Sequence, residues 1–479
     1  MERSENEAGV NGHGYPCQIM DKTHRKKVYY SICIYAAFFS IGWMRGLYGP
    51  ALVDILFISD VSLDLGSLVF TFNSIGYIFG CLGGKYLAGR WNRNMLYGLN
   101  TLALGILIGV TPWCYLFVLM VAVHFGQGTV TGIIDTVGNI EILSLWSNDR
   151  KMFFFLELMF VTGTFVSPFV AAPFLLDTDA SVHVFNDSLN EQSETQQWNT
   201  TDTLSTQSSH LYIPYTLTAC LNICICLPFF VFSLKHYLRN IKTSHEVEAT
   251  DTKKSLPSKY ISCFVVICSS LLFLGMALGE GFISYLAVYC VEQLSFTTSE
   301  GAVISSISGG CSIAAVVVSL FVTSLNTLVY LGIHVVGTLS GVGFFLVCSL
   351  VRFTSGVWLL AGVIGYFRTM IFSLTLSWTN EYITQATSTI VSIYMVSTSA
   401  GCALVPILLG KLMETYTNQW FCYMFLILGT LVLLLYILGV ILTKKVVMVY
   451  GKTNERENDC SRPESEPLAL NAVKRASRV

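Results

Sequence analysis

Long, continuous runs of apolar residues recur along the chain, with short polar segments between them. Each run has at least about 17 residues, so as a helix it could cross a hydrocarbon core of about 30 Å. The twelve runs lie roughly at 28–53, 66–90, 94–111, 113–143, 150–175, 211–234, 260–290, 299–322, 327–350, 356–380, 386–412 and 420–443. A membrane β-barrel would instead show alternating segments of about ten residues. The pattern therefore predicts an all-α integral membrane protein with twelve transmembrane helices.

Composition agrees with this pattern. Hydrophobic residues make up 53% of the 479 residues and charged residues only 12%, with a mean hydropathy of +0.60. Such a chain is too apolar for a soluble globular domain. It contains no phosphate-binding P-loop and no nucleophile elbow, so neither ATP-driven pumping nor hydrolysis is indicated. We expect no enzyme activity and no cofactor, and the cysteines, which mostly lie in the runs, indicate packing and no metal site.

The distribution of lysine and arginine predicts the orientation in the membrane. Basic residues gather before the first run, in the loops after the second and fourth runs, in the central break and after the last run, whereas the opposite side has only Arg352 and Lys411. Cytoplasmic loops are enriched in lysine and arginine. We therefore predict that both termini are cytoplasmic. The basic ends are expected to attract anionic lipid, with no nucleic acid as partner.

The loop 176–210 is predicted to lie outside the cell. It contains no lysine or arginine and carries two glycosylation sequons, at Asn186 and Asn199. Charge and sequons thus agree on its side, and they indicate passage through the secretory route. Residues 1–27 are polar, so we expect the first run to act as an uncleaved signal anchor. The expected location is the plasma membrane, with an endosomal or lysosomal membrane as the alternative.

A polar, basic break divides the runs six and six. The expected organisation is a cytoplasmic tail at 1–27, a six-helix bundle at 28–234 that includes the external loop, a cytoplasmic loop at 235–259, a second six-helix bundle at 260–443 and a cytoplasmic tail at 444–479. Equal halves are typical of transporters built from two similar bundles around a central cavity.

Several motifs give the chain a family resemblance. Residues 87–93, Leu-Ala-Gly-Arg-Trp-Asn-Arg, resemble a degenerate form of the signature between spans 2 and 3 of the major facilitator superfamily. The segments 49–54, 132–139 and 163–168 resemble its sodium-dependent glucose transporter 1 group, also called major facilitator superfamily domain-containing protein 4, which is related to fucose:proton symporters. The resemblance implies the fold above, transport of a hexose or similar small polar solute, and roles for Asp54 and Asp135 in proton coupling and sugar binding.

The chain departs from the family pattern at particular positions. Gly89 replaces the aspartate of the signature, which puts the charge relay of that loop in doubt. Glu157 stands where relatives more often have a histidine, and Phe372-Ser373 where they have Phe-Pro. The two arginines Arg45 and Arg368 are not part of the recognised sugar pattern, so substrate identity is not carried over.

Four charged residues lie near the middle of separate apolar runs: Arg45, Asp135, Glu280 and Arg368. A charge at bilayer depth costs about 2.5 to 3.5 kcal/mol on insertion scales, so it is tolerated mainly beside a polar cavity or a counter-charge. The four runs are spans 1, 4, 7 and 10, which line the central cavity in the superfamily that the chain resembles. We therefore expect these residues to mark a central site.

Span 4 is the most polar of these helices. His124, Gly128, Thr131, Asp135 and Asn139 are spaced to lie along one face of the helix. Such a stripe faces protein or water. Asp135 and Asn139 are candidates for coupling and sugar contact, and Gln127 offers a further amide. For Asp135 a structural hydrogen bond is the alternative, and a structural role is also expected for His124.

Depth along the helices suggests two roles for the charges. Arg45 and Glu280 both fall in the outer half, so they are candidates for a gate ion pair that forms when the outside closes; the alternative is that each is satisfied by backbone or water. Two arginines can balance two of Asp135, Glu157 and Glu280, which leaves one carboxylate to bind a proton or sodium. The candidate set for substrate and ion coupling is Arg45, Asp54, His124, Gln127, Asp135, Asn139, Glu157, Glu280 and Arg368.

We therefore expect a monomeric transporter that works by alternating access, with a hexose or other small polar solute as substrate and sodium or a proton as co-ion. The paired arginines leave an organic-anion or other charged-solute carrier as an alternative. A membrane protein that senses or scaffolds without transporting is the third alternative, because the signature after span 2 is degenerate.

Overall fold

The computed structural model describes residues 22–59, 61, 63–146, 149–174, 210–240, 257–322, 325–385, 387–451 and 453. Within these ranges every regular element is helical. The first half contains α1 (Lys22–Ser59), α2 (Leu63–Ala88), α3 (Arg93–Val110), η1 (Thr111–Trp113), α4 (Phe117–Leu145), α5 (Arg150–Ala171), η2 (Ala172–Phe174) and α8 (Tyr212–Asn240). The external loop with Asn186 and Asn199, most of the central loop and nearly all of both tails lie outside the described residues.

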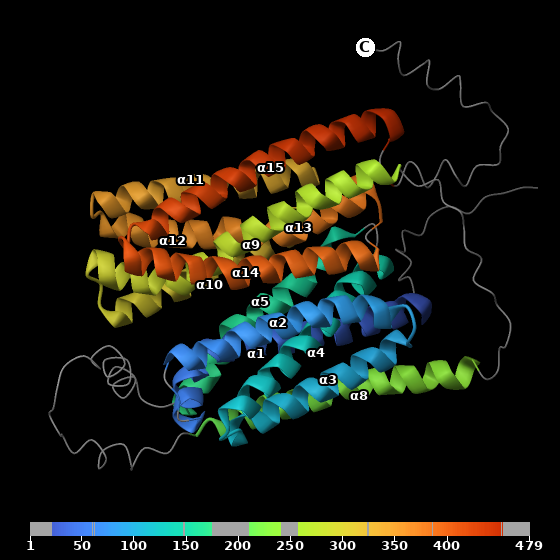
Figure 1. The fold of residues 1–479 in the computed structure, drawn as a ribbon. Coiled ribbons are helices and arrows are strands. Elements are labelled where there is room, and N and C mark those ends of the chain that lie inside the picture. The colour runs from blue at the N-terminus through green and yellow to red at the C-terminus, as the bar shows by residue number, and fades with distance from the viewer. Residues whose placement is uncertain are drawn as a thin grey trace, which may run out of the picture.

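The second half contains α9 (Ser258–Leu294), α10 (Thr298–Phe321), α11 (Thr327–Leu350), α12 (Thr354–Thr369), α13 (Ile371–Trp378), η3 (Thr379–Ile383), α14 (Ser388–Thr415) and α15 (Trp420–Tyr450). Figure 1 shows two groups of helices, with α1 to α5 and α8 in one and α9 to α15 in the other. We call them the N bundle and the C bundle. This architecture confirms the predicted all-helical fold of two bundles.

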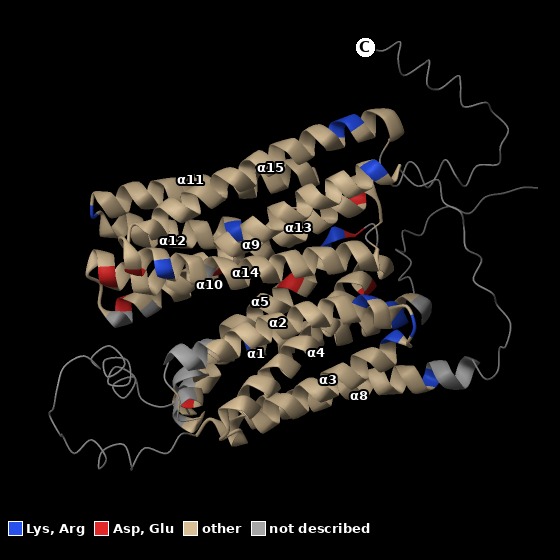
Figure 2. Ribbon diagram, viewed as in Figure 1, with Lys and Arg blue, Asp and Glu red and all other residues tan. Residues whose placement is uncertain are grey.

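Ten of the described helical segments are long and apolar enough to cross a membrane. The helices α1 and α2 are not among the ten, although each lies within the N bundle (Figure 1). The number of twelve transmembrane helices and the cytoplasmic location of both termini stay predictions. Figure 2 shows that the basic residues gather mainly at the end of the molecule where α1 begins and α15 ends, which is the distribution that motivated the predicted orientation.

Span 10 differs from the single helix expected at 356–380. The helix α12 ends at Thr369, α13 begins at Ile371, and a π-helical turn follows at η3. Thr369, Thr375 and Thr379 each donate a side-chain hydrogen bond to the carbonyl oxygen four residues earlier. Such hydroxyl bonds compete with the regular backbone ladder and bend helices. The interruption follows Arg368 directly, so it lies at the level of the predicted site.

The helices α2 and α4 approach each other through glycines on both sides. A Cβ atom at Gly76 or Gly80 would collide with a backbone carbonyl of α4, and one at Gly128 or Gly132 would collide with a backbone carbonyl of α2. Only small residues allow helix backbones to come so close, and in lipid this close packing is a main source of helix association. The glycines Gly76, Gly80 and Gly84 recur every four residues in α2, and we call them the glycine ladder; its packing partner is α4.

The two bundles are joined by hydrogen bonds at the end that we predict to be cytoplasmic. Arg150 of α5 donates to the hydroxyl of Thr327 at 2.7 Å and to the carbonyl oxygen of Leu325 at 3.0 Å. The Thr327 hydroxyl in turn donates to Glu381 Oε2 at 2.5 Å. The loop between α10 and α11 thus receives an arginine from the N bundle. We call this set the cytoplasmic contact, and it closes this end of the molecule.

A methyl group at Gly80 should destabilise the protein, because it would meet the Thr129 carbonyl oxygen of α4 and force the helices apart. Overpacking of this kind costs about 1 to 3 kcal/mol. We expect Gly80→Ala to lower the thermal unfolding midpoint of the detergent-solubilised protein by several degrees. Gly83→Ala is the matched control in the same helix, since no heavy atom lies within 4 Å of the added Cβ. Equal midpoints for the two variants would contradict the proposed packing.

Thr327→Val should loosen the cytoplasmic contact, because valine can neither accept from Arg150 nor donate to Glu381. Leaving such groups without a partner costs about 1 to 3 kcal/mol. We expect faster backbone hydrogen exchange at the beginnings of α5 and α11, measured by mass spectrometry in nanodiscs. Thr430→Val is the control, because the exposed Thr430 hydroxyl bonds only to a carbonyl of its own helix. Unchanged exchange in Thr327→Val would show that the contact does not hold this end closed.

Candidate functional site

Five charged side chains from five helices interact with one another in the middle of the molecule. They are Arg45 of α1, Asp135 of α4, Glu157 of α5, Glu280 of α9 and Arg368 of α12. Electrostatic interactions connect Arg45 with Asp135 and Glu280, and connect Arg368 with Glu157 and Glu280. Each side chain keeps some solvent exposure despite its position along the helix. We call this set the central charges, and it includes all four residues that the energy argument singled out.

The position of these five residues follows from the cost of burying charge. Figure 2 shows that few acidic or basic residues lie along the middle of the helices, where side chains face lipid or the protein interior. A charge in that region is stable only beside water or an opposite charge. The partial exposure and the mutual interactions of the central charges meet this requirement, and the five residues come from both bundles.

Asp135 is held by hydrogen bonds within the N bundle. The Tyr77 hydroxyl donates to Asp135 Oδ2 at 2.5 Å, and Asn139 Nδ2 donates to Asp135 Oδ1 at 2.7 Å. Asn139 also donates to the Asp135 carbonyl oxygen, so the two residues form a local pair on one face of α4. The predicted alternative, a structural bond between Asp135 and Asn139, is therefore present. It coexists with the electrostatic interaction with Arg45.

Glu157 faces the C bundle. Its Oε2 accepts a hydrogen bond from the Ser373 hydroxyl of α13 at 3.2 Å. Both residues are departures from the family pattern, and the structure brings the two departures into direct contact. This answers the question of which way Glu157 points, which the sequence left open: it lies between the bundles, where it also interacts with Asp135, Glu280 and Arg368.

The two arginines have few direct partners. Arg368 Nη2 donates to Ser312 at the long distance of 3.4 Å, and its buried Nε has no hydrogen-bond partner. Gly279 leaves the space for this side chain, since a Cβ there would lie 3.1 Å from Arg368 Nη1. Arg45 and Glu280 interact electrostatically but do not form an ion pair within the described part of the chain. Their pairing in an externally closed state stays a prediction.

The polar residues near the outer half of α4 belong to a network inside the N bundle. The Tyr48 hydroxyl donates to Gln127 Oε1 and accepts from Asn73, each at 3.0 Å, and Gln127 Nε2 donates to Thr111 at 2.8 Å. His124 bonds the carbonyl oxygen of Met120 through Nδ1. The sequence grouped Gln127, His124 and Asp135 in one candidate site. The structure gives Gln127 and His124 partners inside the N bundle, and Tyr48 links this network electrostatically to Arg45.

Asp54 lies apart from the central charges. It is 1% exposed and sits further along α1, towards the end of the helix that we predict to be external. The joint role of Asp54 and Asp135 that the family resemblance implies stays a prediction. Substrate or proton roles for Asp54, Gln127 and His124 stay predictions.

Tyr77 is a site residue that the sequence reasoning missed. Its side chain is 6% exposed. The Tyr77 hydroxyl bonds Asp135 and contacts the sulfur of Met395 in the C bundle. The guanidinium carbon of Arg45 lies over the Tyr77 ring, 6.0 Å from the ring centroid. A signal existed in the sequence: Tyr77 follows Gly76, the first residue of the glycine ladder, so it borders the face of α2 that approaches another helix. The identity of that helix as α4 was needed to recognise its role.

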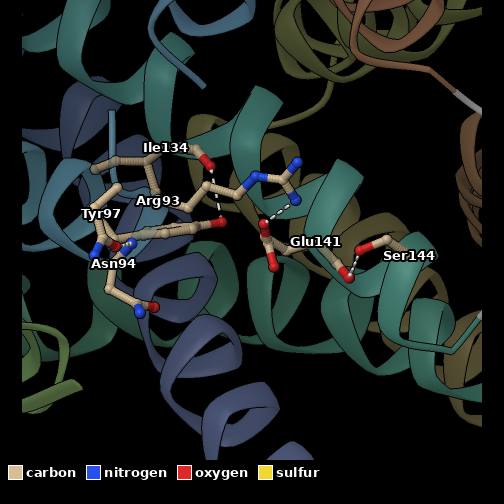
Figure 3. Close-up of polar contacts among 7 residues, drawn as sticks. Arg93, Asn94, Tyr97, Ile134, Glu141 and Ser144 are labelled. Carbon is tan, nitrogen blue, oxygen red and sulfur yellow. Dashed lines mark hydrogen bonds and ion pairs between the residues drawn. The ribbon is translucent and has the colours of Figure 1, made fainter. Parts of the chain in front are cut away.

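The degenerate signature after α2 has a different support from the one expected of the family. Arg93 donates to Glu141 Oε1 of α4 at 2.6 Å, as Figure 3 shows, and the neighbouring Tyr97 hydroxyl bonds the carbonyl oxygen of Ile134 at 3.4 Å. Arg90 lies over the ring of Tyr86 at 4.2 Å. Although Gly89 supplies no carboxylate, the arginines of this loop remain anchored to the N bundle.

Comparison with known proteins supports the same architecture. No family model matches the chain. The sodium-dependent glucose transporter 1A of Mus musculus is 22% identical over 394 residues, which cover 80% of this chain and 90% of that protein. The Homo sapiens sodium-dependent glucose transporter 1 is 23% identical over 396 residues, which cover 80% of this chain and 73% of that protein. The Danio rerio major facilitator superfamily domain-containing protein 4A is 28% identical over 170 residues, which cover 34% of this chain and 31% of that protein.

Solved structures give the fold independently. The E. coli fucose:proton symporter aligns with a TM-score of 0.61 and 15% identity, covering 87% of this chain and 99% of that chain. A proton:xylose symporter aligns with a TM-score of 0.59 and 11% identity, and the alignment covers 85% of this chain and 94% of that chain. The sequence and structure comparisons together confirm the family resemblance that the motifs indicated. The chain has the major facilitator fold, and it is similar to the sodium-dependent glucose transporter 1 and major facilitator superfamily domain-containing protein 4 group.

Proposed function

We propose that the chain is an alternating-access transporter that takes up glucose or another small polar solute together with sodium or a proton. The observation that carries the proposal is the convergence of five charges from both bundles on one accessible region of a major facilitator fold. Transporters of this architecture place substrate and ion sites near the middle of the membrane, between the bundles. The names of the relatives support a sugar as substrate.

Charge balance supports coupling to a cation. The central charges comprise two arginines and three carboxylates, so 3 − 2 leaves one negative charge uncompensated when all five are ionised. An uncompensated charge in the middle of a membrane protein is costly, and binding of one proton or one sodium ion would remove it. Asp135 is the preferred carrier, because Tyr77 and Asn139 hold its carboxylate in place. With Asp135 neutralised, the two glutamates Glu157 and Glu280 balance the two arginines Arg45 and Arg368.

The contacts between the bundles support the alternating-access part of the proposal. The cytoplasmic contact joins α5 to the beginning of α11 through Arg150, whereas Arg45 and Glu280, further towards the predicted external side, form no ion pair in the part of the chain that the structure describes. A transporter closed inside and accessible outside would have this asymmetry. The proposed cycle breaks the cytoplasmic contact and brings Arg45 and Glu280 together.

The second candidate is a carrier of an organic anion or another charged solute. It is favoured by the arginines, since among the described residues the buried Arg368 Nε has no hydrogen-bond partner and Arg45 forms no ion pair. A guanidinium group binds carboxylate in a planar, bidentate manner. For either candidate we propose a monomer in the plasma membrane, with lipid around the bundles and with the external loop glycosylated at Asn186 and Asn199.

Uptake of labelled D-glucose into proteoliposomes should distinguish the candidates. We expect an inward sodium or proton gradient to stimulate uptake several-fold over liposomes without protein. Asp135→Asn should abolish the stimulation by the gradient, because the amide cannot take up a cation by charge neutralisation. Asp149→Asn is the matched control, since the half-exposed Asp149 lies directly before α5, outside the central charges, where it accepts a hydrogen bond from the backbone N–H of Lys151.

Two other outcomes would overturn the leading proposal. If glucose enters no faster than in empty liposomes while labelled carboxylates accumulate, the protein is an anion carrier. If neither sugars nor anions are taken up by correctly folded protein, transport itself is ruled out, and a sensing or scaffolding role is the better account.

A further inference from the structure

Tyr77 makes contacts with three different helices. Its hydroxyl is 2.5 Å from Asp135 Oδ2 on α4 and 3.5 Å from the sulfur of Met395 on α14, and its ring lies 6.0 Å from the guanidinium carbon of Arg45 on α1. Asp135 and Arg45 belong to the N bundle, whereas Met395 belongs to the C bundle. Tyr77 is thus the residue through which the hydrogen bonds of Asp135 reach the opposite bundle.

The Tyr77 hydroxyl has one hydrogen and two acceptors. An ionised carboxylate forms the stronger, charge-assisted bond, while a thioether sulfur is a weak acceptor. The hydrogen therefore points to Asp135 as long as Asp135 is ionised. When Asp135 takes up one proton, its own O–H can donate to the Tyr77 oxygen, and the Tyr77 hydrogen becomes available to Met395; tyrosine keeps its proton throughout. A sodium ion would act differently: it would weaken the carboxylate as an acceptor and could take the Tyr77 oxygen as a further ligand, so that the Tyr77 hydrogen again becomes available to Met395.

We infer that Tyr77 is a positioning residue that couples the state of Asp135 to the contact between α2 and α14. Cation binding at Asp135 turns the Tyr77 hydroxyl towards Met395 and so strengthens the contact between α2 and α14. This contact helps to hold the two bundles together in the conformation that is closed at the cytoplasmic end. This inference rests on the proposed function, because it assigns to Asp135 the role of cation site. It adds the route by which that site acts on the movement of the bundles.

The surroundings of Asp135 restrict which other groups could produce such an effect. Among the described residues, the titratable or charged groups that interact with Asp135 come from four of the helices packed against α4: Arg45 on α1, Tyr77 and Cys81 on α2, Tyr97 on α3 and Glu157 on α5. The helix α14, which also packs against α4, reaches the site through Met395. Of these, Tyr77 and Glu157 have hydrogen bonds that end on the C bundle. Only Tyr77 is also hydrogen-bonded to Asp135 itself.

The inference can be tested without a transported solute, by hydrogen–deuterium exchange of the full-length protein in nanodiscs. Backbone exchange at the beginning of α14 is compared at pH 5.5 and 7.5, and with sodium or potassium at a fixed pH. Variants are compared at the same pH, which cancels the pH dependence of the chemical exchange rate. In the unmodified protein we expect acid or sodium to slow exchange at residues 388–395 by about twofold or more, after each rate is divided by the chemical exchange rate at its pH; this is the range that one hydrogen bond supports.

Tyr77→Phe should remove this response, because the ring remains and only the shared hydroxyl is lost. Met395→Leu, which keeps the volume but not the sulfur, should reduce the response while the bond from Tyr77 to Asp135 persists. Tyr35→Phe is the matched control, since the Tyr35 hydroxyl also contacts a methionine, Met152, but within the N bundle. It should respond as the unmodified protein does.

The change in response separates coupling from a merely structural role, which would alter exchange equally in all conditions. A response in Tyr77→Phe equal to that of the unmodified protein would overturn the inference, as would an unmodified protein that responds to neither protons nor sodium. Because no sugar is present, failure of glucose uptake would leave these outcomes unaffected, so the substrate and the coupling route are tested separately.

Discussion

The close approach of α2 and α4 is the constraint on which the site depends. Glycines on both helices face carbonyl oxygens of the other helix, so the backbones come closer than any larger residue would permit. In a membrane, where water does not drive helices together, such contact supplies much of the association. At this distance the Tyr77 side chain reaches Asp135 across the interface. A wider spacing would leave the carboxylate without its donor and the central charges without a fixed member.

The N bundle and the C bundle contribute differently to the site. The N bundle has a large internal polar network around Tyr48, Asn73 and Gln127, and it holds Asp135 through Tyr77 and Asn139. The C bundle brings Arg368 at the end of α12, directly before an interruption of the helix, and Ser373 just after it. One bundle therefore fixes its carboxylate firmly. The other presents an arginine with few partners on a helix that is locally irregular, which suits a surface that rearranges when a solute binds.

The departures from the family pattern gain meaning when they are seen together. Glu157 and Ser373 differ from the residues expected in relatives, and they form one hydrogen bond between the bundles. Gly89 removes a carboxylate from the loop after α2, yet Arg93 pairs with Glu141 and the bundles are joined instead through Arg150. The chain thus keeps the major facilitator architecture while using its own set of polar contacts to hold the two halves in register.

The sequence by itself determined the membrane class, the two-bundle fold and which charges must lie in a polar interior. These conclusions were accessible because hydrophobic length and the cost of a buried charge are local properties, readable at Arg45, Asp135, Glu280 and Arg368 without knowing any neighbour. The tertiary structure decided which side chains meet. It placed Gln127 and His124 in a network around Tyr48, turned Glu157 towards Ser373, broke span 10 beside Arg368 and revealed Tyr77. Contacts between helices depend on rotation and spacing, which a run of apolar residues does not encode, so this part of the site could be recognised only in three dimensions.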